Sequence, residues 1–316
     1  MKLAIISDTH FGFKEGTELE LDCYINAEQA LQKAFENCDL ILMPGDIFDL
    51  ETPSQQTFDR TFKLFSQFVK ENNSKCILKA PVVAIAGTHE YKGKEYTNPL
   101  DVLESAKYII QLKHNSFSFE KEGEVCEIFG MSGVPEKVAK DVLHKLDFQP
   151  KENSQNILMT HQSYKELLAF DDEMISTLTF EDLPKGFDLY INGHIHKHHL
   201  MQTQNVPILI PGSTIVTQIK QNEIQDKRGF CIYDTKTKDV EFVSIEIQRN
   251  IFYFEIDEKE TTKEILKEKI NELILKVDIK ENTKSYKIFE KNISLLPIIK
   301  IKINATLKLG ENSQMS

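Results

Sequence analysis

Short apolar runs alternate with longer amphipathic stretches at the start of the chain. Leu3–Ser7, Asp39–Pro44 and Pro81–Ala86 are nearly continuous apolar runs, which is typical of strands buried on both faces. Between them, Tyr24–Phe35 and Gln56–Lys70 repeat their apolar residues with the period of a helix. The pattern predicts alternating helices and short buried strands.

Strand patterns dominate the middle of the chain. A helix is predicted at Pro99–Ala106, and strands follow at Glu124–Phe129, Asn156–Met159, Asp188–Ile191, Ile208–Ile210, Gly229–Tyr233 and Val240–Ile247. Helices near the beginning and strands in the middle indicate an α/β (α+β) protein with two packed sheets and helices outside them.

A domain boundary is predicted near Glu246–Asn250. Beyond it, Ile251–Ile256 alternates as a strand, Thr261–Lys276 has the pattern of a charged amphipathic helix, and Pro297–Ile303 is a further strand. We therefore expect one domain at residues 1–247 and a small α+β domain at residues 248–316.

The composition is that of a soluble globular protein, with 41% hydrophobic and 28% charged residues among 316. No apolar run approaches the roughly 20 residues of a membrane span, and the first residues are too briefly apolar for a signal peptide. A cytoplasmic protein is expected. The five cysteines are scattered without a Cys-x-x-Cys pair, which indicates reduced, mostly buried residues.

The net charge of −11 is unevenly distributed. Residues 248–316 carry 13 Lys+Arg and 11 Asp+Glu, whereas residues 1–247 carry 25 and 38. Bound divalent cations would partly neutralise the acidic first part. The nearly balanced second part is the better surface for a polyanion.

Five short segments place polar residues where predicted strands end. They are Ser7-Asp8-Thr9-His10, Gly45-Asp46-Ile47-Phe48-Asp49, Gly87-Thr88-His89-Glu90, Met159-Thr160-His161 and Gly193-His194-Ile195-His196. The glycines that begin three of these segments let the backbone bend sharply there. Ligand sites form outside the carboxyl ends of strands in sheets with helical crossovers, so all five segments can converge.

The spacing within these segments suits a metal site. Asp8 and His10, like His194 and His196, are two residues apart and point the same way in extended backbone. Carboxylate and imidazole ligands together favour Mn, Fe, Zn or Mg. The remaining histidines fit structural roles better, namely His114, His144, His198 and His199.

The five segments, in this order, resemble the calcineurin-like metallophosphoesterases. The surrounding sequence is similar to one branch, the double-strand-break repair nucleases of the SbcD and meiotic-recombination-eleven type. The likeness rests on ISDTHFG from Ile6, MPGDIFDLETPS from Met43, FDLYINGHIHKHH from Phe187 and IPGSTIVTQ from Ile210. It covers residues 1–247 well and residues 249–303 more weakly.

The resemblance implies a four-layer αββα sandwich with a small α+β cap domain that binds DNA. It further implies two divalent metal ions, with Mn²⁺ expected. Asp8, His10 and His196 would bind one ion, His161 and His194 the other, and Asp46 would bridge both. Two ions about 3.5–4 Å apart can clamp a phosphodiester and activate water. His89 would act as general acid, and Asp49 would orient His89.

Two positions depart from the family pattern. Thr88 stands where the family has a metal-binding Asn; its hydroxyl is a poorer ligand, so the second ion would bind weakly or be completed by water. Asp49 stands where some eukaryotic and archaeal members carry a His that handles DNA ends, so Asp49 is given no DNA contact.

The leading prediction is a Mn²⁺-dependent DNA nuclease with 3′-to-5′ exonuclease and single-strand endonuclease activity. It would act as a homodimer, through the helix that carries Phe58, Phe62, Phe65 and Phe68, with an SbcC-like coiled-coil ATPase of the SMC type. One alternative is a small-molecule phosphodiesterase. Another is a scaffold for the ATPase with weak or no activity, marked by Thr88. No ATPase-binding segment is recognised after Ile303, so the chain is either truncated or meets the partner differently.

Overall fold

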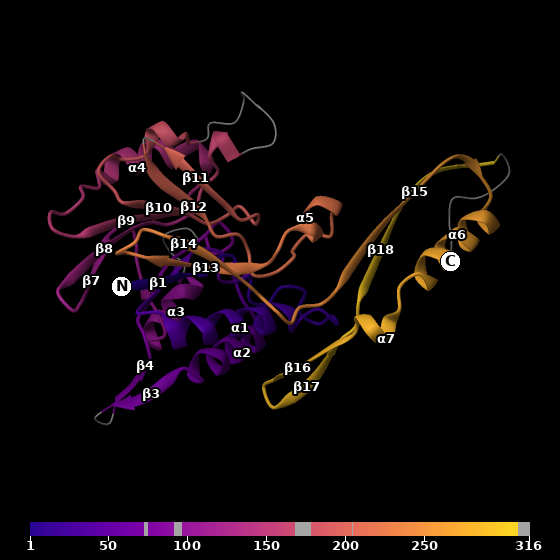
Figure 1. Cartoon of the computed structure of the whole chain (residues 1–316), viewed down its shortest axis with the longest axis horizontal. Coiled ribbons are helices and arrows are strands. Elements are labelled where there is room, and N and C mark those ends of the chain that lie inside the picture. The colour runs from indigo at the N-terminus through magenta and orange to yellow at the C-terminus, as the bar shows by residue number, and fades with distance from the viewer. Residues whose placement is uncertain (73–74, 92–96, 168–177, 204, 309–316) are drawn as a thin grey trace. The chain divides into compact units, whose positions relative to one another are not determined.

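The computed structural model describes residues 1–72, 75–91, 97–167, 178–203 and 205–308 (Figure 1). The chain divides into two units. The first comprises Met1–Ile215 and Lys227–Glu246, and the second comprises Val216–Asp226 and the described residues from Ile247 onward. The short segment before Lys227 therefore groups with the C-terminal unit rather than with its neighbours in sequence.

The first unit contains two six-stranded sheets. The first sheet has the order β14 (Val240–Ser244), β13 (Gly229–Asp234), β1 (Lys2–Ile5), β2 (Leu40–Pro44), β5 (Val82–Ile85), β6 (Ile110–Gln111). The second has the order β11 (His199–Thr203), β12 (Val206–Ile210), β10 (Leu189–Asn192), β9 (Gln155–Thr160), β8 (Glu124–Met131), β7 (Ser116–Lys121). The strands from β1 to β6 are parallel, as are those from β8 to β12 through β9 and β10.

The two sheets share one hydrophobic core. Their facing strands contribute buried aliphatic side chains, among them Leu3, Ile5, Leu42, Val83 and Ile85 from the first sheet and Ile128, Ile157, Met159, Leu189 and Ile191 from the second. A second core lies between the other face of the second sheet and α4 (Glu136–Leu146), which buries Ala139 and Leu143. Aliphatic residues buried on both faces explain why these strands read as continuous apolar runs.

Helices complete the layers of the first unit. Figure 1 shows α1 (Asp22–Asn37) and α2 (Gln55–Ser66) outside the first sheet and α4 outside the second. The shorter elements are α3 (Pro99–Ser105), the 3₁₀ turns Lys165–Leu167 and Phe180–Asp182, and the hairpin of β3 (Val69–Asn72) and β4 (Lys75–Leu78). The predicted αββα sandwich is confirmed.

The predicted helix at Gln56–Lys70 is too long. The helix ends at Ser66, and Val69 already belongs to β3. Phe68 lies beyond the helix, where its ring stacks on Phe35 with 4.6 Å between centroids. Phe68 thus packs on α1 from outside α2, even though the apolar spacing continues the helical pattern.

The second unit is a small α+β structure. Strands β15 (Ile251–Thr261) and β18 (Ile298–Leu307) pair in parallel, and β16 (Lys284–Ile288) and β17 (Lys291–Leu295) form a hairpin. Its helices are α5 (Gln221–Gln225), α6 (Lys263–Leu275) and α7 (Ile279–Asn282). Helix α6 begins where the Thr262 side chain accepts a hydrogen bond from the Ile265 N–H.

Within the described residues, none of the helices has the combination of length and apolarity that crossing a bilayer requires. Four of the cysteines are free and buried, as predicted: Cys23, Cys38, Cys126 and Cys231. The side chain of Cys76 lies outside the described part of the chain.

Candidate metal centre

The polar segments converge because they follow parallel strands. Ser7-Asp8-Thr9-His10 follows β1, Gly45-Asp46 follows β2 and Gly87-Thr88-His89 follows β5 in the first sheet, while His161 follows β9 and His194 follows β10 in the second. Backbone hydrogen bonds join these loops, from the His10 N–H to the Asp46 carbonyl (3.1 Å) and from the Gly193 N–H to the Thr160 carbonyl (3.0 Å). The site is therefore assembled at the carboxyl edges of both sheets.

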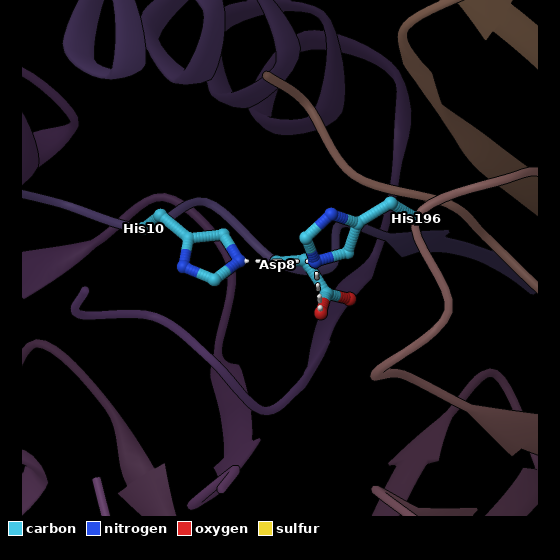
Figure 2. A group of neighbouring side chains, drawn as sticks. All are labelled: Asp8, His10 and His196. Carbon is cyan, nitrogen blue, oxygen red and sulfur yellow. Dashed lines mark hydrogen bonds and ion pairs between the residues drawn. The ribbon is translucent and has the colours of Figure 1, made fainter. Parts of the chain in front are cut away.

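The first ligand group consists of Asp8, His10 and His196. One ligand atom from each lies within 4.8 Å of the others. His10 Nε2 and His196 Nε2 face each other at 3.2 Å, and His196 Nε2 lies 3.7 Å from Asp8 Oδ1 (Figure 2). Asp8 and His10 are almost fully buried. Three ligand atoms converging on one point fit a divalent cation.

The second ligand group consists of Asp46, His161 and His194, again within 4.8 Å of one another. His161 Nδ1 donates to the Pro44 carbonyl (2.7 Å), so Nε2 carries the lone pair of the neutral ring. That Nε2 is buried without a hydrogen bond to any described residue, 3.1 Å from Asp46 Oδ2. A buried nitrogen left in this way is what a metal ligand requires, so the residues present fit a cation here as well.

A third group surrounds His89. The His89 ring is 43% exposed, and its Nδ1 donates to the backbone carbonyl of Asp49 (2.6 Å). The Asp49 carboxylate lies closer to His10 Nδ1 (3.2 Å) than to His89 Nδ1 (3.9 Å). Asp49 therefore contacts both rings, His89 chiefly through its main chain and His10 through its carboxylate.

Thr88 lies at the edge of the second group. Its hydroxyl is 3.5 Å from Asp46 Oδ2, at the limit of a hydrogen bond, and the residue is exposed. The structure thus brings every residue singled out in the sequence to one region of the first unit. Within that region, Thr88 occupies the periphery, next to the carboxylate expected to bridge the two cations.

Burial and neighbouring charges set the ionisation of the second group. Burial works against the charged form of Asp46, but His161 more than offsets this and holds the pKa of the carboxyl well below its ordinary value. Burial likewise opposes protonation of His161, whereas Asp46 and Asp8 raise its pKa to about 10. Burial, reinforced by His161, lowers the pKa of His194 to about 4. A cation bound by Asp46 and His161 would compete with protonation of the His161 imidazole.

The backbone at the ligands is constrained. Asp8, His10, Asp46 and His194 all have positive φ, between 47° and 76°, a region that non-glycine residues rarely adopt. Hydrogen bonds fix these conformations: Asp8 Oδ1 accepts from the His194 N–H (3.1 Å), and Asp46 Oδ1 accepts from the His89 N–H (2.9 Å). Such strain is common at functional sites.

Glycines allow the loops to approach. A Cβ on Gly193 would lie 2.1 Å from the Pro44 carbonyl oxygen, and one on Gly87 would lie 2.2 Å from Asp46 Oδ1. Gly45, by contrast, has a positive φ of 93°. The sharp bend predicted from the sequence therefore applies to Gly45, where a Cβ would also lie 2.3 Å from His161 Nδ1, whereas Gly87 and Gly193 are needed for space.

Glu90 organises the loops, a role that its place beside His89 did not reveal. The residue is fully buried, and its carboxylate accepts hydrogen bonds from the N–H groups of Asp46 (3.1 Å), Phe48 (2.6 Å) and Gly87 (2.7 Å). Burial and the charge of Asp46 raise the pKa of Glu90 to about 8, against the effect of these donors. One side chain thus joins the loops after β2 and β5.

Arg228 holds the backbone of His196 in a similar way. It is 1% exposed, and its guanidinium donates to the His196 carbonyl (2.8 Å) and to Ser213 Oγ (3.0 Å). Ser213 in turn forms an isolated parallel β-bridge with Ser7, the residue before Asp8. A buried arginine far along the chain has no sequence signal that would assign it to the site.

Comparisons with known proteins agree with this geometry. Residues 1–198 match the calcineurin-like phosphoesterase family. The chain is 27% identical over 310 residues to the double-strand break repair protein MRE11 of Encephalitozoon cuniculi, covering 87% of this chain and 53% of that protein. It is 30% identical over 234 residues to the DNA double-strand break repair protein Mre11 of Saccharolobus solfataricus, covering 72% and 58%.

A third relative is matched along the whole chain. Identity to the DNA double-strand break repair protein Mre11 of Sulfolobus acidocaldarius is 26% over 330 residues, which cover 100% of this chain and 78% of that protein. The chain spans little more than half the length of the first two relatives.

Proposed function

The chain belongs to the calcineurin-like phosphoesterase family, and on this premise we propose that it hydrolyses phosphodiester bonds in DNA with two divalent cations. The observation that carries the proposal is the pair of ligand groups, Asp8–His10–His196 and Asp46–His161–His194. The similarity to proteins named for double-strand break repair supports DNA as the substrate.

The ligand groups would hold one cation each, with Asp46 as the bridge and Mn²⁺ as the expected metal. When bound, the two cations supply charge stabilisation at the phosphate and a water activated for in-line attack. Asp8 and Asp46 contribute the negative charge of the site. Their Oδ1 atoms hold the backbone of His194 and His89, so each ligand loop is fixed before a substrate arrives.

His89 is the proposed general acid. Its Nδ1–H is committed to the Asp49 carbonyl, so Nε2 is the atom that can bind and release a proton. Nε2 lies 3.9 Å from Asp46 Oδ2, and the ring is exposed enough to reach a leaving oxygen. A positioned imidazole of this kind contributes about 10²- to 10⁴-fold to a proton-transfer step.

Thr88 bears on the affinity of the second cation. A hydroxyl 3.5 Å from Asp46 Oδ2 replaces the amide that the family motif places there. We propose that the second cation is consequently the weaker one. The same residue is the specific reason to keep a second candidate, a scaffold for a repair ATPase with weak or no nuclease activity.

The second unit is proposed to contact DNA as a cap-like domain. Residues 248–316 are nearly charge-balanced, whereas residues 1–247 are strongly acidic, and this favours the former beside a polyanion. A homodimer through α2, where Phe58 and Phe62 are only half-buried, and an SbcC-like coiled-coil ATPase as partner complete the proposal. A cytoplasmic location is part of it.

Cleavage assays with defined substrates test the proposal. The protein, loaded with Mn²⁺, is incubated with 5′-labelled and 3′-labelled single strands, with duplexes, and with methyl p-nitrophenyl phosphate. Metal-dependent DNA cleavage, 3′-to-5′ on duplex ends and endonucleolytic on single strands, is expected. Rapid turnover of the small diester with intact DNA would instead establish a small-molecule phosphodiesterase and refute the DNA nuclease.

A further inference from the structure

Ser163 lies two residues beyond His161 and is 94% buried, with 6% of its surface exposed. Its Oγ donates to Glu136 Oε1 at 2.6 Å and lies 3.1 Å from His194 Nε2. Glu136 is the first residue of α4, on the outer side of the second sheet. A hydroxyl thus connects a carboxylate to one of the histidines of the second ligand group.

Counting protons fixes the direction of this chain of contacts. A carboxylate can only accept, so the single hydroxyl proton of Ser163 goes to Glu136. Toward His194, the Ser163 oxygen can then only accept, and His194 Nε2 must carry the proton that it receives. A neutral ring protonated on Nε2 has its lone pair on Nδ1. His194 is therefore directed to bind a cation through Nδ1.

This orientation is opposite to that of His161. His161 donates from Nδ1 to the Pro44 carbonyl and keeps Nε2 for a cation. His10 likewise has its Nδ1 beside a polar group, 3.2 Å from the Asp49 carboxylate. In each of these three rings, one nitrogen has a polar neighbour outside the two ligand groups, and for His194 that nitrogen is Nε2 and the neighbour is Ser163.

The segments that follow β9 and β10, which carry Ser163 and His194, are joined next to the contact. Asn192 Oδ1 accepts from the Gln162 N–H (3.0 Å) and from Thr160 Oγ1 (2.9 Å), and its Nδ2 donates to the Gln162 carbonyl (3.0 Å). These bonds hold the backbone before Ser163 against the backbone before His194. The hydroxyl is therefore positioned by hydrogen bonds that join the two segments immediately beside it.

We propose that Ser163 and Glu136 act as positioning residues that hold His194 as its Nε2–H tautomer and present Nδ1 to the second cation. The inference rests on the metal-binding part of the proposed function and is independent of the substrate. A carboxylate that polarises a metal-bound imidazole raises the basicity of the ligating nitrogen. Here the carboxylate acts through a hydroxyl, and its place in the first turn of α4 favours its negative charge.

The contact that runs from Glu136 through Ser163 to His194, here called the relay, matters more in this chain because of Thr88. With a hydroxyl where the family motif has an amide, the second cation depends more heavily on Asp46, His161 and His194. Loss of the contact that orients His194 should then lower the affinity for the second cation and leave the affinity for the first unchanged. This selectivity separates positioning from a general effect on folding.

Mn²⁺ titration of the full chain, followed by calorimetry and by electron paramagnetic resonance, measures the two cations directly. The unaltered protein is expected to bind two. Ser163→Ala should weaken one of them by about 10- to 100-fold, the range for residues that support a metal ligand, and leave the other unchanged. Glu136→Gln should weaken the same cation by a smaller factor because its carboxylate is exposed and screened. Ser163→Thr, which keeps the hydroxyl, should restore binding.

Matched controls and a metal-free measurement complete the test. Ser154→Ala removes a hydroxyl that donates to the Lys151 carbonyl, and Glu152→Gln neutralises an exposed carboxylate nearby; both should bind two cations normally. Nitrogen-15 NMR of the metal-free histidine rings should give the Nε2–H tautomer for His194. The opposite tautomer, or equal weakening of both cations by Ser163→Ala, would overturn the relay. An unaltered protein that binds no second cation would overturn the metal site as well.

Discussion

In the ligand group formed by Asp8, His10 and His196, two imidazole nitrogens face each other at 3.2 Å, whereas in the group formed by Asp46, His161 and His194 a carboxylate faces an imidazole at 3.1 Å. The His196 side chain is 22% exposed, and that of His161 is fully buried. A cation in the first group would therefore take the place of a hydrogen bond between two imidazoles, and a cation in the second would meet a fully buried carboxylate–imidazole pair.

The two ligand groups, although similar in composition, are therefore expected to differ in their affinity for a cation. A cation in the first group takes the place of the hydrogen bond between His10 Nε2 and His196 Nε2 and is bound by both nitrogens. A cation in the second group must compete with protonation of His161, whose pKa the Asp46 carboxylate raises, and it has Thr88 as the neighbouring hydroxyl. We expect the second cation to bind more weakly, and the structure around it compensates with the Glu90 and Ser163 contacts.

Removing the shared bridge should have the largest effect. Asp46→Asn takes away a charge that both cations use and is expected to lower DNA cleavage by about 10³-fold, corresponding to about 4 kcal/mol. Calorimetry with Mn²⁺ should show loss of the second cation and weakening of the first. Asp59→Asn, on the exposed face of α2 where Asp59 pairs with Lys63, is the control and should change neither. Retained cleavage in Asp46→Asn would contradict the bridging role.

Removing the proton donor should separate chemistry from metal binding. His89→Gln is expected to lower kcat by about 10²- to 10⁴-fold because no group remains to protonate the leaving oxygen. Both cations should still bind, since His89 belongs to neither of the two ligand groups. His144→Gln, an exposed histidine beside Asp182, serves as the control. An unchanged kcat in His89→Gln would exclude it as the general acid.

Filling the space between the loops should disturb the second group more than the first. In Gly193→Ala, the added methyl would lie 2.1 Å from the Pro44 oxygen and 2.6 Å from His161 Nδ1. We expect a loss of about 1–3 kcal/mol in the free energy of unfolding, measured by urea denaturation, with preferential weakening of the second cation. Gly123→Asn, at an open turn with positive φ, should be tolerated. Full stability of Gly193→Ala would show that the loops are not tightly packed.

Restoring the family amide should have the smallest effect, and in the opposite direction. Thr88→Asn is expected to tighten the second cation by about 1 kcal/mol, on the order of fivefold, because an amide oxygen is a better ligand than a hydroxyl. Cleavage at limiting Mn²⁺ should rise with it. Thr88→Ser is the matched control. A variant with both cations bound and no cleavage would favour the scaffold.

Much of the site could be predicted from the sequence because its ligands follow apolar strands. Asp8, Asp46 and His161 each come shortly after an apolar run that is typical of a buried strand, and parallel strands bring their ends to one edge. The order of the layers followed from the same runs. The helix predicted at Gln56–Lys70 is too long because the apolar spacing continues to Phe68, which lies beyond the end of α2 and packs on Phe35.

The supports of the site could not be predicted in this way. Ser163 and Glu136 are 27 residues apart, and Ser163 and His194 are 31 residues apart. Helix α4 packs an apolar face against the second sheet, with Ala139, Val142, Leu143 and Leu146, but that face gives no information about Glu136 at its first residue. Arg228 and Glu90 act through backbone groups, and a hydrogen bond to a backbone group leaves no pattern in the sequence.

Anomalous diffraction from a crystal soaked in Mn²⁺, measured at the Mn absorption edge, is the decisive test of the two-cation site. Two peaks about 3.5–4 Å apart are expected, one bound by Asp8, His10 and His196 and the other by Asp46, His161 and His194. The second peak should have the lower occupancy at limiting Mn²⁺. Peaks that touch neither group, or a single ion without contact to Asp46, would contradict the two-cation site.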